Sequence, residues 1–417
     1  MSAFALKGGT LIDGNGGPPL PHSLVVVEGT QIRYAGPALE EELQVPTLDM
    51  TGRYLLPGLI DAHIHLSGVS QYGVEGFVLE PEIQKTLVAG ADARRMLRRG
   101  FTTVGDISRN GIYLRDLIAA GVLEGPRVVA TGNGFCRTTG HSISRYLPHD
   151  LSHHRHPWAE EADSPWGLRS AIRLRLQEGP DAIKIWATGG GIWALDRKED
   201  THYTWEEISA AVEEAAMVGL PVWSHAEGLE GARLSCQAGV WAIIHGQELD
   251  EACLDQMAEK GIFLCPTIQF LEGWFQSHPP AEKPEQQAYP GDTVAQRELA
   301  RVYGNLRKAI DRGIKITVGS DSYCEKELPY GLTSLEEMRH LKTAGLSEEE
   351  ILIAATKHGA EMLRVDHLTG TLEAGKQADL LVLEADPLAD IRHLTVENMA
   401  FVLKDGVRYP IEGKEPF

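Results

Sequence analysis

Short apolar runs alternate with amphipathic stretches through the middle of the chain. The amphipathic stretches have helical periodicity, and several end in glycine, as helix C-termini often do. Strands that alternate with helices form parallel sheets, so these units predict an α/β fold, a closed (β/α)8 TIM-like barrel rather than an open sheet. The predicted strands are residues 55–66, 102–107, 126–132, 181–188, 221–226, 241–246, 262–267 and 314–321.

The two ends of the chain share another pattern. Near both ends, short apolar runs are broken by glycine and other turn-forming residues, which is typical of antiparallel strands. We therefore expect residues 1–55 and 368–417 to form one small β-sandwich domain, with the barrel of residues 56–367 inserted between them. Residues 137–167 and 269–292 are long insertions after the third and seventh strands, where barrel enzymes place active-site loops, and they are candidate lids.

The first barrel strand carries polar residues at alternating positions. In the stretch LIDAHIHL, residues 59–66, side-chain alternation would place Asp61, His63 and His65 on one face and an apolar row on the other. Two imidazoles side by side can bind one metal ion. The alternative is a strand with polar residues at its exposed end.

Polar residues also occur at the ends of other predicted strands. His225 ends the fifth strand, His245 the sixth and Asp321 the eighth. Each alone has an ordinary explanation, a hydrogen-bonded structural histidine or a turn aspartate. Because the carboxyl ends of barrel strands meet at one face, the set together indicates a functional site.

Lys184 lies inside the fourth predicted strand. Its neighbours Ile183 and Ile185 would face the helices, which turns Lys184 inward. A buried lysine is costly unless it is neutral or paired. One interpretation is a salt bridge to an inward aspartate. The other is that the neutral amine reacts with carbon dioxide, and the resulting carbamate bridges two cations.

Composition narrows the classes of partner. A formal net charge of −20 argues against nucleic acid and anionic membranes. No apolar run is long enough to span a bilayer, and the first residues lack a signal-peptide pattern. The five cysteines are scattered without a CxxC pair, which is typical of reduced thiols, so we expect a cytoplasmic protein.

These motifs together resemble the amidohydrolase superfamily, dinuclear metal type, over essentially the whole chain. LLPGLIDAHIHL is similar to its P-G-x-I-D-x-H-x-H strand. DAIKIWATGGG, PVWSHAEG, GVWAIIHG and VGSD occur where its bridging lysine, third and fourth histidines and aspartate belong. GFTTVGDI and GPRVVATGNGFCRTTGHS are similar to the branch that contains imidazolonepropionase-like enzymes and prolidase-like (Xaa-Pro) dipeptidases.

The resemblance implies a homo-oligomeric enzyme with two divalent metal ions, zinc first, with cobalt, manganese or iron as alternatives. A hydroxide between the ions would be the nucleophile, and Asp321 would pass its proton to the leaving nitrogen. The implied ligands are His63, His65, Lys184 as N6-carboxylysine, His225, His245 and Asp321.

The expected function is hydrolysis of an amide-like C–N bond in a small molecule. Within the same mechanism, the alternatives are an Xaa-Pro-like dipeptidase and a carbamate or phenylurea hydrolase. A mononuclear deaminase would have a glutamate three residues after His225 and no bridging lysine, whereas here Glu227 comes two residues after it and Lys184 is present. A non-catalytic scaffold on the same barrel would lack metal ligands, and this chain retains all six.

Four residues are candidates for substrate binding. His141 resembles a substrate-contacting histidine of this branch, and the alternative is a loop residue that only shapes the lid. Arg137 and Arg145 flank it and would bind a carboxylate by bidentate hydrogen bonds, with a solvated surface position as the alternative. Glu227 stands where dipeptidase-like relatives tend to have Tyr or His. Its carboxylate would repel a substrate carboxylate and attract an ammonium or amide N–H, which favours a neutral N-acyl, carbamoyl or urea-type substrate over a dipeptide.

Overall fold

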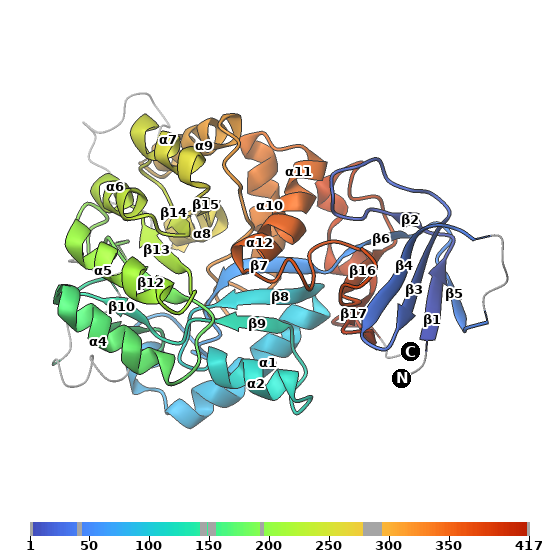
Figure 1. The fold of residues 1–417 in the computed structure, drawn as a ribbon, viewed down its shortest axis with the longest axis horizontal. Coiled ribbons are helices and arrows are strands. Elements are labelled where there is room, and N and C mark those ends of the chain that lie inside the picture. The colour runs from blue at the N-terminus through green and yellow to red at the C-terminus, as the bar shows by residue number, and fades with distance from the viewer. Residues whose placement is uncertain are drawn as a thin grey trace.

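A barrel of parallel strands surrounded by helices forms the larger part of the molecule, and sheets built from both ends of the chain lie beside it (Figure 1). The computed structural model describes residues 3–39, 44–141, 148, 156–191, 196–277 and 294–414. This arrangement confirms the predicted (β/α)8 fold class. No helix in the described part of the chain has the length and apolar character needed to cross a membrane.

The barrel strands pair in parallel in two runs, β7-β8-β9 and β11-β10-β12-β13-β14-β15. They are short, as the apolar runs in the sequence predicted, and helices separate most of them. Their bounds are β7 (Leu59–Ile64), β8 (Phe101–Asp106), β9 (Arg127–Ala130), β10 (Gly134–Cys136), β11 (Ala159–Glu161), β12 (Ile183–Trp186), β13 (Val222–Ala226), β14 (Ala242–His245) and β15 (Phe263–Cys265).

The segment predicted as the eighth strand is not a regular strand, although it closes the barrel. It makes one isolated parallel bridge, between Ile316 and Leu264 of β15. On its other side, the backbone N–H of Ala62 donates to the Val318 carbonyl at 2.8 Å. The N–H of Asp321 donates to the carbonyl of His63, also at 2.8 Å. The segment therefore lies between β7 and β15 as a barrel strand would.

The helices cover the outside of the barrel, and three of them, α6, α7 and α10, end at a glycine with left-handed backbone. The glycine after α7 is one that the sequence pattern predicted as a helix end. The insertion after the seventh strand begins as a helix, α8, rather than as a loop. The bounds are α1 (Glu82–Arg98), α2 (Gly111–Ala119), α4 (Ser164–Leu176), α5 (Trp205–Ala216), α6 (Leu229–Ala238), α7 (Glu251–Lys260), α8 (Ile268–Ser277), α9 (Val294–Asp311), α10 (Leu332–Ala344), α11 (Glu348–Ile353) and α12 (Gly359–Met362).

Strand β7 departs from simple alternation. Its register with β8 shifts between Asp61 and Ile64. Ile60 and Ala62 pack among residues inside the barrel, whereas Ile64 packs in the layer between barrel and helices. Asp61 accepts a hydrogen bond of 2.6 Å from Ser334 Oγ on α10. The expectation that Asp61 shares a face with the two histidines is therefore wrong, because the bulge changes the side on which the following residues lie.

Two further sheets come from the ends of the chain. The order β4-β3-β1-β5 uses N-terminal strands alone, and the order β18-β17-β16-β6-β2 combines strands from both ends. One buried cluster contains residues from both, including Leu6, Val25, Leu55 and Phe401. This shared core supports the proposal that residues 1–55 and 368–417 form a small domain. The strands are β1 (Ala3–Lys7), β2 (Thr10–Leu11), β3 (Ser23–Glu28), β4 (Gln31–Pro37), β5 (Thr47–Asp49), β6 (Tyr54–Pro57), β16 (Leu380–Leu383), β17 (Met399–Lys404) and β18 (Val407–Tyr409).

Candidate active site

A pocket lies where the barrel strands end. Histidines at the ends of β7, β13 and β14 reach into it, together with an aspartate from the segment that closes the barrel. Side chains from the connecting segments complete its walls. The lining residues are His63, His65, Tyr72, Phe77, His141, Trp158, Trp186, His225, Glu227, His245, Phe270, Asp321 and Tyr323.

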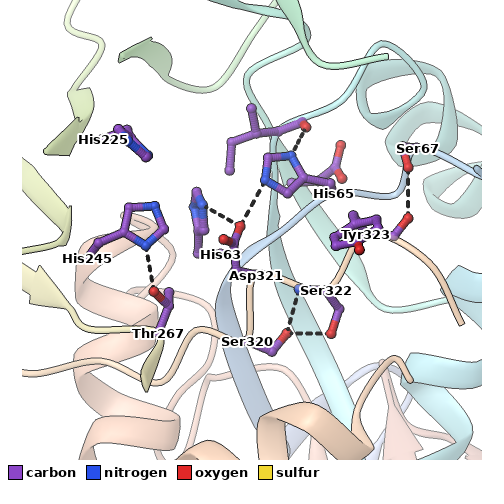
Figure 2. A network of polar contacts seen from close by, with 12 residues as sticks. His63, His65, Ser67, His225, His245, Thr267, Ser320, Asp321, Ser322 and Tyr323 are labelled. Atoms are coloured by element: carbon purple, nitrogen blue, oxygen red, sulfur yellow. Dashed lines mark hydrogen bonds and ion pairs between the residues drawn. The ribbon is translucent and has the colours of Figure 1, made fainter. Parts of the chain in front are cut away.

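The first group of potential metal ligands is His63, His65 and Asp321 (Figure 2). Oδ1 of Asp321 lies 3.2 Å from Nε2 of His63 and 3.0 Å from Nε2 of His65. The three side chains are buried. An aspartate and two imidazoles that converge on one point form a donor set suited to a divalent metal ion.

The hydrogen bonds of His65 favour a cation in this group. Nδ1 of His65 lies 2.7 Å from the carbonyl oxygen of Ile107, which only accepts hydrogen bonds, so Nδ1 carries the hydrogen. In the neutral ring, Nε2 then presents its lone pair to the carboxylate of Asp321. Two lone pairs that face each other at 3.0 Å are stabilised when a cation binds both.

The second group is His225, Glu227 and His245. The rings of His225 and His245 lie 4.5 Å apart between centroids. Nδ1 of His245 lies 2.6 Å from Thr267 Oγ1, and in Figure 2 this contact lies on the side of the ring away from His225. Nε2 of His245 has no hydrogen-bond partner among the described contacts, so it remains available for a ligand.

Backbone strain marks two of the candidate ligands. His245 has φ 73° and Asp321 has φ 56°, a left-handed backbone conformation that residues other than glycine rarely adopt. Such strained residues persist where the surrounding structure holds them, and they are common in active sites. In both residues the chain turns at the end of a barrel strand.

Lys184 lies close to both groups. It is 1% exposed, and Ile183 and Ile185 beside it pack in the layer facing the helices, as predicted. Its Nζ has no hydrogen-bond partner among the described residues and lies 5.3 Å from the centroid of the Trp186 ring. Burial lowers the pKa of Lys184 to about 7, despite the opposing charge of Asp321. A substantial fraction of this amine is therefore neutral at neutral pH.

Burial favours the neutral form of three imidazoles of the site, His63, His225 and His245. Burial and the charge of Lys184 lower the pKa of His63 to about 3. Burial also holds the pKa values of His225 and His245 well below the usual range. Burial acts to raise the pKa of Asp321, but His63 and His65 hold it well below its usual range. Neutral imidazoles and an ionised carboxylate are the forms that bind metals.

His141 lines the same pocket and has a partner that the sequence did not suggest. Its Nδ1 lies 2.7 Å from Oδ2 of Asp196, and its ring stacks on that of His225 at 4.4 Å. Asp196 is 55 residues further along the chain in a connecting segment, and no motif singles it out. Tyr72, Phe77 and Tyr323 in the pocket wall were likewise not predicted, because single aromatic residues in short connecting segments carry no periodic signal.

Neither candidate arginine is placed in this pocket by the described residues, and only Arg137 is among those residues. Arg137 lies near His202 and Tyr203 and is not among the lining residues. Arg145 lies outside the described residues. Their expected role, to clamp a substrate carboxylate, stays a prediction. Glu227 does line the pocket, and its Oε1 lies 3.9 Å from Nε2 of His225.

Comparisons with known proteins agree with these observations. Residues 54–408 match the Amidohydrolase family. An ochratoxinase of Aspergillus niger is 28% identical over 407 residues, which covers 92% of this chain and 82% of the relative. An imidazolonepropionase of Rhizorhabdus wittichii is 26% identical over 419 residues, covering 91% of this chain and 92% of the relative.

A solved structure of a Xaa-Pro dipeptidase with methionine bound in its active site is 29% identical. It superposes with a TM-score of 0.84 and covers 98% of this chain and 100% of its own. The resemblance seen in the sequence motifs is thus confirmed. The chain belongs to the Amidohydrolase family, and it is a hydrolase of carbon–nitrogen bonds.

Proposed function

We propose that this protein is a dinuclear metal-dependent hydrolase that cleaves an amide-like C–N bond of a small molecule. One observation carries the proposal. Two buried ligand groups lie side by side in one pocket, and Lys184 is close enough to His63, His225 and His245 to lower the pKa of each. Within the described part of the chain, the amine of Lys184 has no hydrogen-bond partner.

The residues fit two divalent ions. His63, His65 and Asp321 would hold the first ion, and His225 and His245 the second. Imidazole nitrogens with carboxylate oxygens suit zinc best, and cobalt, manganese or iron as alternatives. When bound, the ions would supply a hydroxide nucleophile at neutral pH and polarise the scissile carbonyl.

Lys184 would complete both sites as its carbamate. The neutral amine adds to the carbon of carbon dioxide: one N–C bond forms, one C=O π bond opens onto oxygen, and one N–H proton leaves to solvent, which gives an anionic group with two oxygens. This modification removes an unpaired ammonium from a buried position, and such an ammonium is costly to bury. The depressed pKa of Lys184 supports the reaction because it makes the amine available.

Asp321 would move the proton. Its carboxylate faces His63 and His65 and also lines the pocket, so one group reaches both the ligand cluster and the substrate space. It would accept the proton from the attacking water and donate it to the leaving nitrogen. A carboxylate whose pKa is held low gives this proton up readily.

The substrate would lack a carboxylate on the side that faces Glu227. This buried carboxylate would repel an anion, which favours an N-acyl, carbamoyl or urea-type compound. A dipeptidase is the second candidate, and the similarity to a Xaa-Pro dipeptidase favours it. The mononuclear deaminase and the non-catalytic scaffold are less consistent with two complete ligand groups.

We also propose a homo-oligomer in a reducing compartment such as the cytoplasm. Exposed apolar residues recur at helical spacing on neighbouring surfaces, Ile83 and Leu87 on α1 and Tyr113 and Leu117 on α2, which supports self-association. All five cysteines are buried and lie outside disulfide bonds, which supports the reducing compartment. Light scattering of the purified protein tests the assembly.

Metal analysis and a substrate screen test the main proposal. Protein loaded with Zn²⁺, Co²⁺ or Mn²⁺ should bind about two ions per chain. The loaded protein is then assayed against dipeptides, N-acyl amino acids, carbamates, phenylureas and lactones. We expect hydrolysis of compounds without a C-terminal carboxylate. A strict requirement for that carboxylate would favour the dipeptidase, and binding of fewer than two ions would contradict the dinuclear centre.

A further inference from the structure

Asp196 and His141 form a buried pair beside the second ligand group. Oδ2 of Asp196 lies 2.7 Å from Nδ1 of His141, and the two residues are 4% and 7% exposed. The ring of His141 stacks on that of His225, with the centroids 4.4 Å apart and the planes inclined by 27°. His141 lines the pocket, whereas Asp196 is not among the described lining residues. Asp196 would therefore act on a substrate through the ring of His141.

The chain after β12 folds back on itself and places Asp196 at the end of the barrel strands. Residues 187–189 and 200–202 exchange backbone hydrogen bonds, so the two ends of this segment lie side by side. Between them, the backbone N–H of Gly190 donates to Oδ2 of Asp196 at 3.1 Å. The same oxygen thus contacts both the backbone of the segment and the ring of His141. The carboxylate is fixed before any ligand binds.

Two glycines allow the pair to approach so closely. A Cβ atom at position 189 would lie 2.5 Å from Oδ1 of Asp196, and one at position 190 would lie 2.5 Å from Cε1 of His141. Both distances are shorter than real Cβ contacts, so any other residue at either position would displace the carboxylate or the ring. The stretch ATGGG, residues 187–191, therefore has a role that the metal ligands do not require.

The carboxylate decides which nitrogen of His141 carries the hydrogen. Burial acts to raise the pKa of Asp196, but His141 and the N–H of Gly190 hold it below its ordinary value. An ionised carboxylate only accepts hydrogen bonds, so Nδ1 of His141 is an N–H group that donates to it. Nε2 has no hydrogen-bond partner among the described residues, and it is the nitrogen left to contact a molecule in the pocket.

We propose that Asp196 is a positioning residue of the hydrolytic reaction, which holds His141 against the second ligand group with Nε2 available to the substrate. The inference rests on the proposed hydrolase function and assigns a role to a residue outside both metal ligand groups. An aspartate that holds an imidazole by one nitrogen fixes the tautomer and the orientation of the other. A ring fixed in advance loses little further freedom when it meets the substrate.

NMR of the zinc-loaded protein with isotope-labelled histidine tests the pair without turnover. The native chain should show a low-field Nδ1–H resonance of His141 that exchanges slowly with solvent, assigned by its absence from His141→Ala. Asp196→Ala removes the acceptor and should abolish this resonance. Asp196→Asn should retain it, because the N–H of Gly190 keeps the amide oxygen in place. Glu199→Ala, at an exposed position on the same segment, should also retain it and is the control.

Kinetics on an amide hydrolysed in the substrate screen test the role in the reaction. Asp196→Ala should lower kcat/KM by about 10²-fold, the size of loss that a misplaced group in an active site produces. In a His141→Ala chain, the same substitution should have little further effect, because Asp196 acts through the ring. Asp196→Asn should fall between the native chain and Asp196→Ala, and Glu199→Ala should match the native chain.

The outcomes separate the inference from the proposed function. A native chain without the low-field resonance, or an Asp196→Ala chain that keeps it, would overturn the inference alone. Equal losses of kcat/KM from Asp196→Ala in the native and His141→Ala chains would show support of the fold rather than of the ring, and would also overturn it. So would loss of a zinc ion from His141→Ala, which would make His141 a metal ligand. The expected resonances with no amide hydrolysed anywhere in the screen would overturn the proposed function alone.

Discussion

Oδ1 of Asp321 lies 3.0 Å from Nε2 of His65, although 256 residues separate the two in the chain. The backbone explains the contact, because the N–H of Asp321 donates to the carbonyl of His63 where the last barrel segment lies along β7. Closure of the barrel thus creates the first ligand group. A change that opens the barrel between these segments would separate the group without altering any ligand.

Asp321→Asn should retain much of its bound metal and lose most of its turnover. The amide still offers an oxygen to a cation, but it cannot accept and return a proton. The loss should be about 10²-fold to 10⁴-fold in kcat, the range for removal of a general base. Metal analysis and kcat are measured on one preparation, with Asp366→Asn, an exposed position, as the control. Full turnover in Asp321→Asn would rule out the proton-transfer role.

Lys184→Ala should lose activity, and short carboxylic acids should partly restore it. The cavity left by the side chain would admit acetate or propionate, whose two oxygens replace those of the carbamate. The measurement is activity against acid concentration, together with metal content. Lys342→Ala removes an exposed lysine paired with Glu348 and should show neither loss nor rescue. Unchanged activity in Lys184→Ala would refute the bridging role.

Glu337→Gln should change the pH dependence of stability. Burial raises the pKa of Glu337 to about 8, and its carboxyl accepts the backbone N–H of Gln269 at 2.7 Å. Between pH 4.5, the ordinary pKa of a glutamate, and about pH 8, the folded protein therefore keeps a proton that the unfolded chain has released. The free energy of unfolding falls by about 1.4 kcal/mol per pH unit from this group as pH rises towards 8, and is flat above that.

The glutamine variant should lack this fall, so its stability relative to the native chain should increase between pH 5 and pH 8. Denaturant unfolding at several pH values measures it. Glu336→Gln removes a partly exposed carboxylate paired with Arg339. Its free energy of unfolding should depend on pH in the same way as that of the native chain. If the free energy of unfolding of Glu337→Gln also followed the native pH dependence, Glu337 would be ionised in the folded state.

Arg127→Leu should weaken the contact between the barrel and the terminal sheets. Arg127 on β9 pairs with Asp379 at 2.5 Å and with Asp405 at 2.7 Å, and the side chain of Asp379 is fully buried. Removal of the guanidinium leaves a buried carboxylate unpaired, which should cost about 3 kcal/mol of unfolding free energy. Arg392→Leu, which breaks an exposed pair with Asp390, should change the free energy of unfolding much less. Equal costs would argue against a stabilising contact at Arg127.

The local sequence determined those parts of the site that depend on neighbouring residues. Ile183 and Ile185 predicted that Lys184 points inward, because strand alternation relates adjacent side chains directly. The recurrence of polar residues at strand ends predicted that His225, His245 and Asp321 lie in one pocket. These inferences need only two rules: side chains alternate along a strand, and the carboxyl ends of parallel barrel strands meet at one face.

Tertiary packing decided the rest. The bulge in β7 turned Asp61 towards Ser334 on α10, and nothing in the alternating pattern marks a bulge. Asp196 reached His141 because two connecting segments fold over the same strand ends, and the aromatic residues of the pocket wall came together in the same way. Contacts between segments distant in the chain depend on how the whole core packs, which no local period encodes.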